Sequence, residues 1–402
     1  MAAKVDWGKY IITSSALALF VPAGLAAKQS MVVIFLILVV AIGVRTFATE
    51  PRLLLPSKIV AGLFITLLFY AALTHYFIIS CHPCGYTALL KLPMLGLVVW
   101  IASTKMVIVD TAQSQKIPLV LGISLFVAVL FLAIEVLNDA TIYRHMTGRL
   151  DDASVVISRY NRGTSALVIL VWPISAWLID HGHRVSAFLL TFTICVVVVF
   201  GDSGSALVSM LLACSTAALA LLWPLLSFWI IAAGVALFTL FAPILFLFLL
   251  HWLQPISDLI PPSTLDRLEI WHHSASAVLQ APVFGYGIGV SRYLAIPAEL
   301  GVNYKYFVVP TTHPHNAAIQ IWLELGAIGL VLMMLLIWFI ARPITKLNGY
   351  NRIAALASST AIIFTGLVSY GFWQETWLSI IGVTIICFKF LGQSSKNTVG
   401  KD

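Results

Sequence analysis

Long apolar runs separated by short polar segments dominate the chain. A helix needs roughly 20 apolar residues to cross the hydrocarbon core of a membrane. Runs of this kind fall at residues 10–26, 31–46, 58–79, 87–109, 117–138, 164–180, 184–200, 205–223, 226–251, 314–341, 353–371 and 373–391. The pattern predicts an all-α polytopic membrane protein with about twelve transmembrane helices, although eleven or thirteen would also fit it.

The composition indicates the same class and excludes an ordinary soluble enzyme. Of the 402 residues, 60% are hydrophobic and only 10% are charged, whereas a soluble domain carries about 25% charged residues. The net charge of +7 indicates membrane topology and anionic lipid rather than nucleic acid. The first run follows Lys4 and Lys9 without a small-residue cleavage site, so we expect a retained anchor rather than a signal peptide.

The polar segments divide the chain into three parts. Residues 1–251 hold spans one to nine, residues 252–313 form a large loop with amphipathic helices, and residues 314–402 hold the last three spans and a polar tail. Long loops without a function are uncommon. With both termini in the cytoplasm, most basic residues lie inside, as the positive-inside rule expects, and the large loop lies on the outer face.

Arginines are concentrated on this outer face. The basic residues expected there are Lys28, Arg144, Arg149, Arg159, Arg162, Arg267, Arg292 and Lys305. Because the planar fork of arginine binds phosphate oxygens in pairs, the set suits a lipid-linked phosphate. The same arginines could instead bind lipid headgroups or pair with Asp151, Asp152, Asp266 and Glu269.

The start of the tenth span carries polar residues that a lipid-facing helix would not tolerate. Pro314 fits the first turn of a helix, which places His315 at or near a helix N-terminus. The partial positive charge there disfavours imidazolium, so we expect a neutral histidine that can accept a proton. The residues expected to support it are His313 and a polar stripe spaced four apart, Asn316, Gln320 and Glu324.

Glycines and isolated polar residues supply weaker candidates. Gly326 and Gly329 permit close helix approach, and the glycine-rich stretch 281–289 lacks P-loop spacing, so we interpret it as a turn that approaches a ligand or another helix. Asp202, before the eighth span, could be a base but more simply caps a helix.

Two pairs of residues leave metal binding open. His272 and His273 could bind a metal, but they lack an acidic or thiol partner at suitable spacing and fit better as interfacial histidines. Cys81 and Cys84 could form a disulfide or remain free thiols, and two cysteines are too few for a structural zinc site.

Several reaction types are excluded because the residues that they need are missing from the sequence. The sequence has no carboxylate set at metal-binding spacing, no GxSxG motif and no cysteine placed to pair with His315. We therefore expect direct transfer from a phosphate-linked, lipid-borne donor without a metal or other cofactor, with arginines stabilising the departing diphosphate.

The residues around His315 resemble a known family. His315-Asn316, nine residues and then Gly326-Ala327-Ile328-Gly329 are similar to the signature of bacterial O-antigen ligases. Arg267 with Trp271, and the stretch 282–289, add to a resemblance that covers about residues 160–335. The resemblance implies a GT-C-type glycosyltransferase of the bacterial inner membrane, with its active site facing the periplasm.

That resemblance also implies substrates and roles. The donor would be undecaprenyl-diphosphate-linked O-antigen, the acceptor a sugar hydroxyl of lipid A–core, and membrane lipids would be the surroundings. His315 would be the general base and Arg267 would hold the diphosphate. A single displacement would invert the anomeric carbon without a nucleotide sugar or a metal.

One departure and several alternatives stay open. Relatives often carry an arginine near the start of the eighth span, where this chain has Asp202-Ser203-Gly204-Ser205, so Arg159 or Arg162 would have to supply that phosphate contact, with Arg292 as a further ligand. An O-antigen polymerase is the nearest alternative. Protein O-oligosaccharyltransferases are a further alternative, but they tend to be longer and to carry an added soluble domain. A transporter of lipid-linked saccharide would place charges near mid-membrane and show repeated halves, whereas the polar residues here gather at one face.

Overall fold

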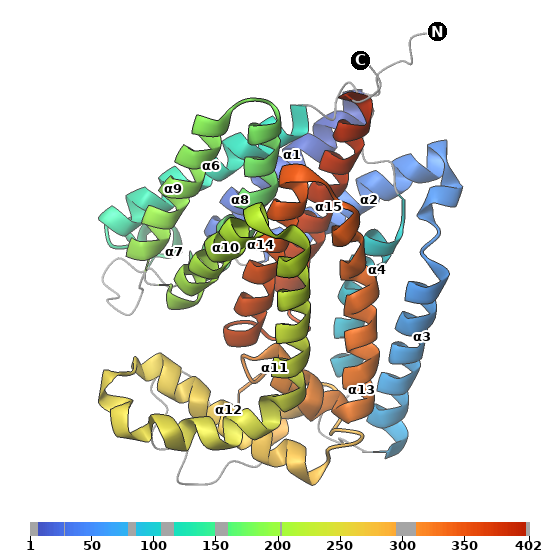
Figure 1. Cartoon of the computed structure of the whole chain (residues 1–402), viewed down its shortest axis with the longest axis vertical. Coiled ribbons are helices and arrows are strands. Elements are labelled where there is room, and N and C mark those ends of the chain that lie inside the picture. Colours follow the sequence, from blue (N-terminus) through green and yellow to red (C-terminus); the bar gives the residue numbers. More distant parts are fainter. Residues whose placement is uncertain are drawn as a thin grey trace.

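The computed structural model describes residues 7–27, 29–78, 86–105, 116–148, 160–201, 203–294 and 311–398. Within these ranges the regular structure is helical, and no strand occurs (Figure 1). The α-helices are α1 (Trp7–Ala26), α2 (Ser30–Thr49), α3 (Lys58–Leu73), α4 (Leu92–Ser103), α6 (Lys116–Leu137), α7 (Thr141–Thr147), α8 (Asn161–Asp180), α9 (Arg184–Phe200), α10 (Gly204–Leu222), α11 (Pro224–Leu253), α12 (Pro262–Gln280), α13 (Ala317–Ala341), α14 (Gly349–Val368) and α15 (Glu375–Thr398). The short helical segments are η1 (Pro51–Leu54), η2 (Thr74–Ile78), η4 (Tyr86–Lys91), η6 (Gln254–Leu259), η7 (Val290–Tyr293) and η8 (Arg342–Lys346).

The helices confirm a polytopic helical membrane protein. Eight of those in the described ranges are long and apolar enough to cross a membrane, and three shorter apolar stretches lie at Ile11–Ala26, Leu89–Ser103 and Arg184–Phe200. Each apolar run in the sequence overlaps a helix within the described residues. The count of twelve spans stays a prediction, as do the roles of Arg159, Asp202, Cys81 and Cys84, which lie outside the described residues.

Helix α8 lies at the centre of the bundle. Its apolar stretch is 83% buried, against 28% for α10 and 22% for α11. It packs against α1, α6, α9, α10, α14 and α15, whereas α10 and α11 expose leucine and phenylalanine side chains, as lipid-facing helices do. The first turn of α8, which carries Arg162, is therefore held by protein on several sides.

Helix α12 lies where the sequence predicts an amphipathic helix within the large loop. In Figure 1 it lies crosswise at the end of the bundle where α11 ends and α13 begins. Trp271 and Ala275 pack in an apolar cluster with Phe246 of α11 and with Ala318 and Ile319 of α13. This cluster fixes the helix that carries Arg267 against the start of α13.

A break in α13 receives the glycine-rich turn. Gly326 has φ +60° and ψ −166°, which is not helical. A Cβ on Gly326 would lie 2.4 Å from the carbonyl oxygen of Val283, and one on Gly285 would lie 2.6 Å from the nitrogen of Gly326. Only glycine tolerates both this backbone and this approach. The turn therefore approaches a helix, which is one of the two partners expected for it.

Backbone hydrogen bonds replace the helical ones at this break. Tyr286 N–H donates to the carbonyl of Leu323 (2.8 Å) and Gly287 N–H to that of Glu324 (2.9 Å). In return, Ala327 N–H donates to the carbonyl of Pro282 (2.8 Å). The hydroxyl of Tyr70, on α3, donates to the carbonyl of Leu325 (2.8 Å). Backbone carbonyl and N–H groups that lose their helical partners at the break are thus hydrogen-bonded to the turn or to Tyr70, as buried backbone groups require.

Candidate active site

His315 lies two residues before α13 and is held by the turn that follows α14. Its Nδ1 lies 3.0 Å from the carbonyl oxygen of Ser369. A carbonyl oxygen can only accept, so Nδ1 carries the proton and Nε2 is the basic nitrogen. His315 also has φ +57°, a left-handed backbone that is uncommon outside glycine and that clusters at functional sites.

The segment before α13 is tied down on both sides of His315. The side chain of Asn316 caps the helix by accepting from Ile319 N–H at 3.1 Å, and the Trp271 indole donates to the carbonyl of Pro314 at 2.8 Å. The prediction that His315 lies at a helix N-terminus is confirmed. The prediction that Pro314 lies in the first helical turn is wrong, because Asn316 is the cap and the helix begins at Ala317.

Gln320 and Glu324 face the same turn, 369–374, from inside α13. Gln320 accepts from Phe372 N–H (2.7 Å) and donates to Glu324 (3.0 Å). The second oxygen of Glu324 accepts from the indole of Trp373 at 2.6 Å. The buried carboxylate of Glu324 is thus paired with the amide of Gln320 and the indole of Trp373. Both residues secure the turn whose Ser369 carbonyl orients His315.

His313 forms a pair with His315. The two ring centroids are 4.3 Å apart, and the hydroxyl of Thr312 lies 2.9 Å from Nδ1 of His313. The ring lies against Gly371, where a Cβ would be 2.7 Å from Cγ of His313. Glycine at that position lets the imidazole approach the backbone of the turn.

Burial and nearby cations keep both rings neutral. The pKa of His315 is lowered to about 4, chiefly by burial and also by the positive charge of Arg267, against the opposing effect of the Ser369 carbonyl. Burial likewise lowers the pKa of His313 to about 3, with contributions from His315 and from the charges of Lys91, Arg292 and Arg162. At neutral pH the pair can therefore accept protons.

The cations come from four separate elements. Arg267 lies on α12, is half-buried, and donates to the Ser263 carbonyl at 3.3 Å. Burial lowers its pKa while Asp266 opposes the shift. Arg162 lies in the first turn of α8, and Arg292 lies exposed in η7. Three of the four expected diphosphate ligands thus act electrostatically on the histidine pair, and the fourth, Arg159, is outside the described residues.

Lys91 is a site residue that the sequence interpretation missed. The sequence places it within the fourth apolar run, but the structure places it at the end of η4, directly before α4. Its charge acts on His313 together with those of Arg162 and Arg292. The available signal was a lysine near the start of the fourth apolar run, and a charged residue within a predicted span is itself grounds for a functional hypothesis.

Other polar candidates have local roles. Arg144 pairs with Asp139 at 3.2 Å, which is not one of the four acidic residues suggested from the sequence. Nδ1 of His272 lies 3.2 Å from the carbonyl of Leu247 on α11, which fits an interfacial histidine. Within the described ranges, no three His, Cys, Asp or Glu residues are grouped to hold a metal ion.

Comparison with known proteins finds a family match over part of the chain. Residues 187–334 match the sequence model of the family described as O-Antigen ligase, and this range contains Arg267, His315 and Gly326. This match supports a place for the chain in the O-antigen ligase family.

Several relatives of this chain come from Rickettsia. It is 29% identical over 237 residues to a Rickettsia felis protein named "Putative polysaccharide ligase", covering 56% of this chain and 57% of that protein. A Rickettsia typhi protein of similar name is 29% identical over 231 residues, covering 56% of each chain. One from Rickettsia conorii is 35% identical over 122 residues, covering 29% of each chain. The matches with the first two span a little over half of those relatives.

Proposed function

We propose that this protein is an O-antigen ligase: a GT-C-type glycosyltransferase that moves a polysaccharide from undecaprenyl diphosphate to a sugar hydroxyl of lipid A–core. The reaction takes place at the periplasmic face of the bacterial inner membrane. The observation that carries the proposal is the orientation of His315, with Nδ1 held by the Ser369 carbonyl and cations on four different elements around the histidine pair.

The chemistry follows from these groups. Nε2 of His315 accepts the proton of the acceptor hydroxyl while its oxygen bonds to the anomeric carbon of the donor. The bond between that carbon and the diphosphate oxygen breaks, and undecaprenyl diphosphate leaves with the electron pair. Arg267, Arg162, Arg292 and Lys91 stabilise the charge that develops on it. One displacement inverts the anomeric carbon.

Donor binding itself prepares the base. In the empty site, burial and the charge of Arg267 depress the pKa of His315. A diphosphate placed among the cations neutralises them and adds negative charge beside the ring. Both effects favour imidazolium, so the pKa of His315 rises when the donor is present. The histidine becomes a stronger base only when there is a substrate to activate.

The test is a lipopolysaccharide gel of cells that lack the gene, complemented with the wild-type gene or with His315→Ala. We expect both the null strain and His315→Ala to show bare lipid A–core while polymerised O-antigen accumulates on its lipid carrier. His272→Ala, on α12, is the matched histidine control and should restore ligation. A core that carries a single repeat unit would instead identify an O-antigen polymerase and overturn the proposal.

A further inference from the structure

Glu135 is a buried carboxylate that the chemistry at His315 does not use. Its side chain is 0% exposed and lies near the end of α6. It accepts from the backbone N–H groups of Ile142 (2.8 Å) and Tyr143 (3.0 Å) and from the hydroxyl of Tyr160. One carboxylate thereby joins three elements: the end of α6, the start of α7 and the residue before α8.

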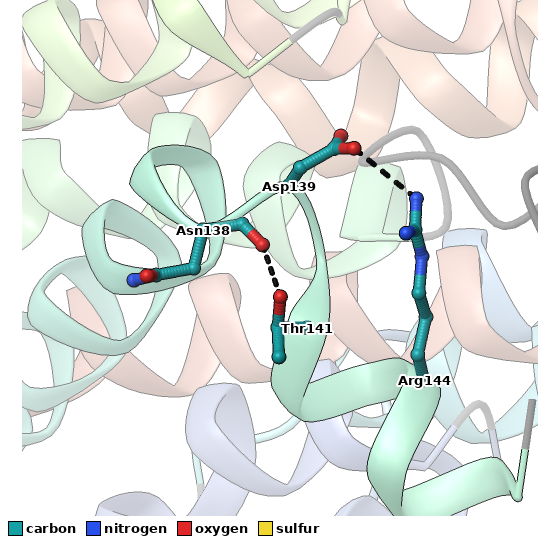
Figure 2. Close-up of polar contacts among 4 residues, drawn as sticks. All are labelled: Asn138, Asp139, Thr141 and Arg144. Atoms are coloured by element: carbon teal, nitrogen blue, oxygen red, sulfur yellow. Dashed lines mark hydrogen bonds and ion pairs between the residues drawn. The ribbon is translucent and has the colours of Figure 1, made fainter. Parts of the chain in front are cut away.

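The turn between α6 and α7 has a fixed shape that aims α7 at this carboxylate. Asp139 and Ala140 adopt left-handed backbone, with φ +51° and +59°. The hydroxyl of Thr141 donates to the carbonyl of Asn138, and Arg144 pairs with Asp139 at 3.2 Å (Figure 2). The N-cap residue of α7 supplies no side-chain hydrogen bond, so Glu135 takes the N–H groups that a cap would otherwise satisfy.

Tyr160 connects Glu135 to the start of α8. It is 2% exposed, and its ring packs edge-on against Phe131 (5.7 Å) and Tyr143 (5.6 Å). Burial, and then the neighbouring Glu135, raise the pKa of Tyr160, so the phenol keeps its proton and donates. Tyr160 is the N-cap residue of α8, two positions before Arg162.

A second contact fixes the other side of Arg162. A Cβ on Gly163 would lie 2.2 Å from Cδ2 of Leu25, so α8 is pressed against α1 at this glycine. Arg162 stands between Tyr160 and Gly163 in the first turn. With both neighbours held, the backbone of Arg162 is fixed at the start of α8.

We propose that Glu135 is a positioning residue for donor binding: through Tyr160 it fixes the first turn of α8 and directs Arg162 toward the lipid-linked diphosphate. This inference rests on the proposed ligase function and extends it to a residue outside the site. A buried carboxylate is a poor source of stability compared with an apolar side chain of similar volume. Its use here is explained by geometry, since an apolar residue could not accept three hydrogen bonds.

The experiment is a double-mutant cycle on purified protein with a polyprenyl-diphosphate-linked saccharide as donor. Tyr160→Phe removes only the hydroxyl, and Glu135→Gln replaces one acceptor oxygen by a donor. We expect each to raise the donor KM about fivefold to tenfold, the equivalent of one lost hydrogen bond, with kcat and the acceptor KM nearly unchanged. In an Arg162→Ala background neither change should raise the donor KM further.

A structural control separates positioning from stability. Ser358→Ala removes a buried hydrogen bond from α14 to the Ile169 carbonyl of the same helix, α8 (2.9 Å). It should lower the melting temperature without changing the donor KM. If Tyr160→Phe raises the donor KM equally with and without Arg162, or leaves it unchanged in folded protein, the inference is wrong.

The two proposals fail differently. If Arg162→Ala leaves the donor KM unchanged while His315→Ala abolishes ligation, the positioning inference fails and the ligase function stands. If His315→Ala also ligates normally, both fail.

Discussion

The imidazole of His315 donates through Nδ1 to the carbonyl oxygen of Ser369, 3.0 Å away and 54 positions later in the chain. The bond fixes both the tautomer and the ring plane, because the turn that carries Ser369 is itself secured to α13 through Gln320 and Glu324. The tautomer of His315 is therefore set by a backbone carbonyl. A side-chain substitution at Ser369 would not remove this acceptor.

His315→Asn should lower kcat by about 10² to 10⁴, the usual contribution of a general base. Asparagine tolerates the left-handed backbone at this position and its amide can still donate to Ser369, so the fold should be preserved. Rates of ligation by purified protein measure the effect, and the melting temperature reports folding. Wild-type kcat in His315→Asn would exclude a basic role for this residue.

Arg267→Gln should raise the pKa of His315, because it removes a positive charge that depresses it. Protonation of His315 would then begin at higher pH on acidification, while burial still holds the pKa below 6.5. The rate at which diethyl pyrocarbonate modifies His315 as a function of pH, followed by peptide mass spectrometry, gives the midpoint without requiring activity. Arg292→Gln is the control, since its charge acts on His313; equal midpoints in Arg267→Gln and wild type would contradict the prediction.

Acidification should destabilise the protein through the same pair. The pKa values are lowered to about 3 for His313 and about 4 for His315, from a usual value of 6.5. Between pH 6.5 and 4 the unfolded chain binds protons that the folded chain does not, so the free energy of unfolding falls as pH falls. Melting temperatures in detergent across this window should decline less steeply for the double variant His313→Gln, His315→Gln. Parallel curves would show that other groups dominate.

Trp373→Phe should destabilise the protein by about 1–3 kcal/mol, because it leaves a buried oxygen of Glu324 without its indole donor. Trp322→Phe is the matched control: its indole donates to the Thr239 carbonyl at 2.8 Å from a half-buried position, and the acceptor there is neutral. Chemical denaturation in mixed micelles compares the two. A smaller loss for Trp373→Phe than for Trp322→Phe would contradict the assignment of Glu324 as the more demanding acceptor.

Gly326→Ala should prevent the turn from docking, because its Cβ would lie 2.4 Å from the Val283 carbonyl oxygen and the backbone there has φ +60°. We expect loss of folded protein on size-exclusion chromatography. Gly62→Ala, in α3, has nothing within 4 Å of the added Cβ and should change stability by less than about 1 kcal/mol. Normal yield and activity for Gly326→Ala would show that the break can be rebuilt.

The apolar spans and the position of His315 before a helix could be predicted from the sequence, because both depend on local pattern. Apolar runs locate helices directly, and the polar residues after Pro314 mark a helix start. Local pattern gave the wrong register for Pro314, since the cap is set by the Asn316 side chain and by the Trp271 bond from another helix.

Contacts between distant segments could not be read from the sequence. The Ser369 carbonyl has no sequence signal, and the charge of Lys91 acts on His313 only because the fold brings η4 to that end of the bundle. Gly326 and Gly329 suggested close helix packing, whereas the structure uses Gly326 to break a helix and admit a turn.

The docked turn also defines which parts of the protein can be exchanged among relatives. Residues 282–287 complete the hydrogen bonding of residues 323–328, so turn and helix form one unit although they are far apart in the chain. A chimera that swaps only the large loop would leave an open helix in one partner and an unmatched turn in the other. Segment exchanges between this chain and its relatives should therefore include both segments, with Tyr70 as the third component.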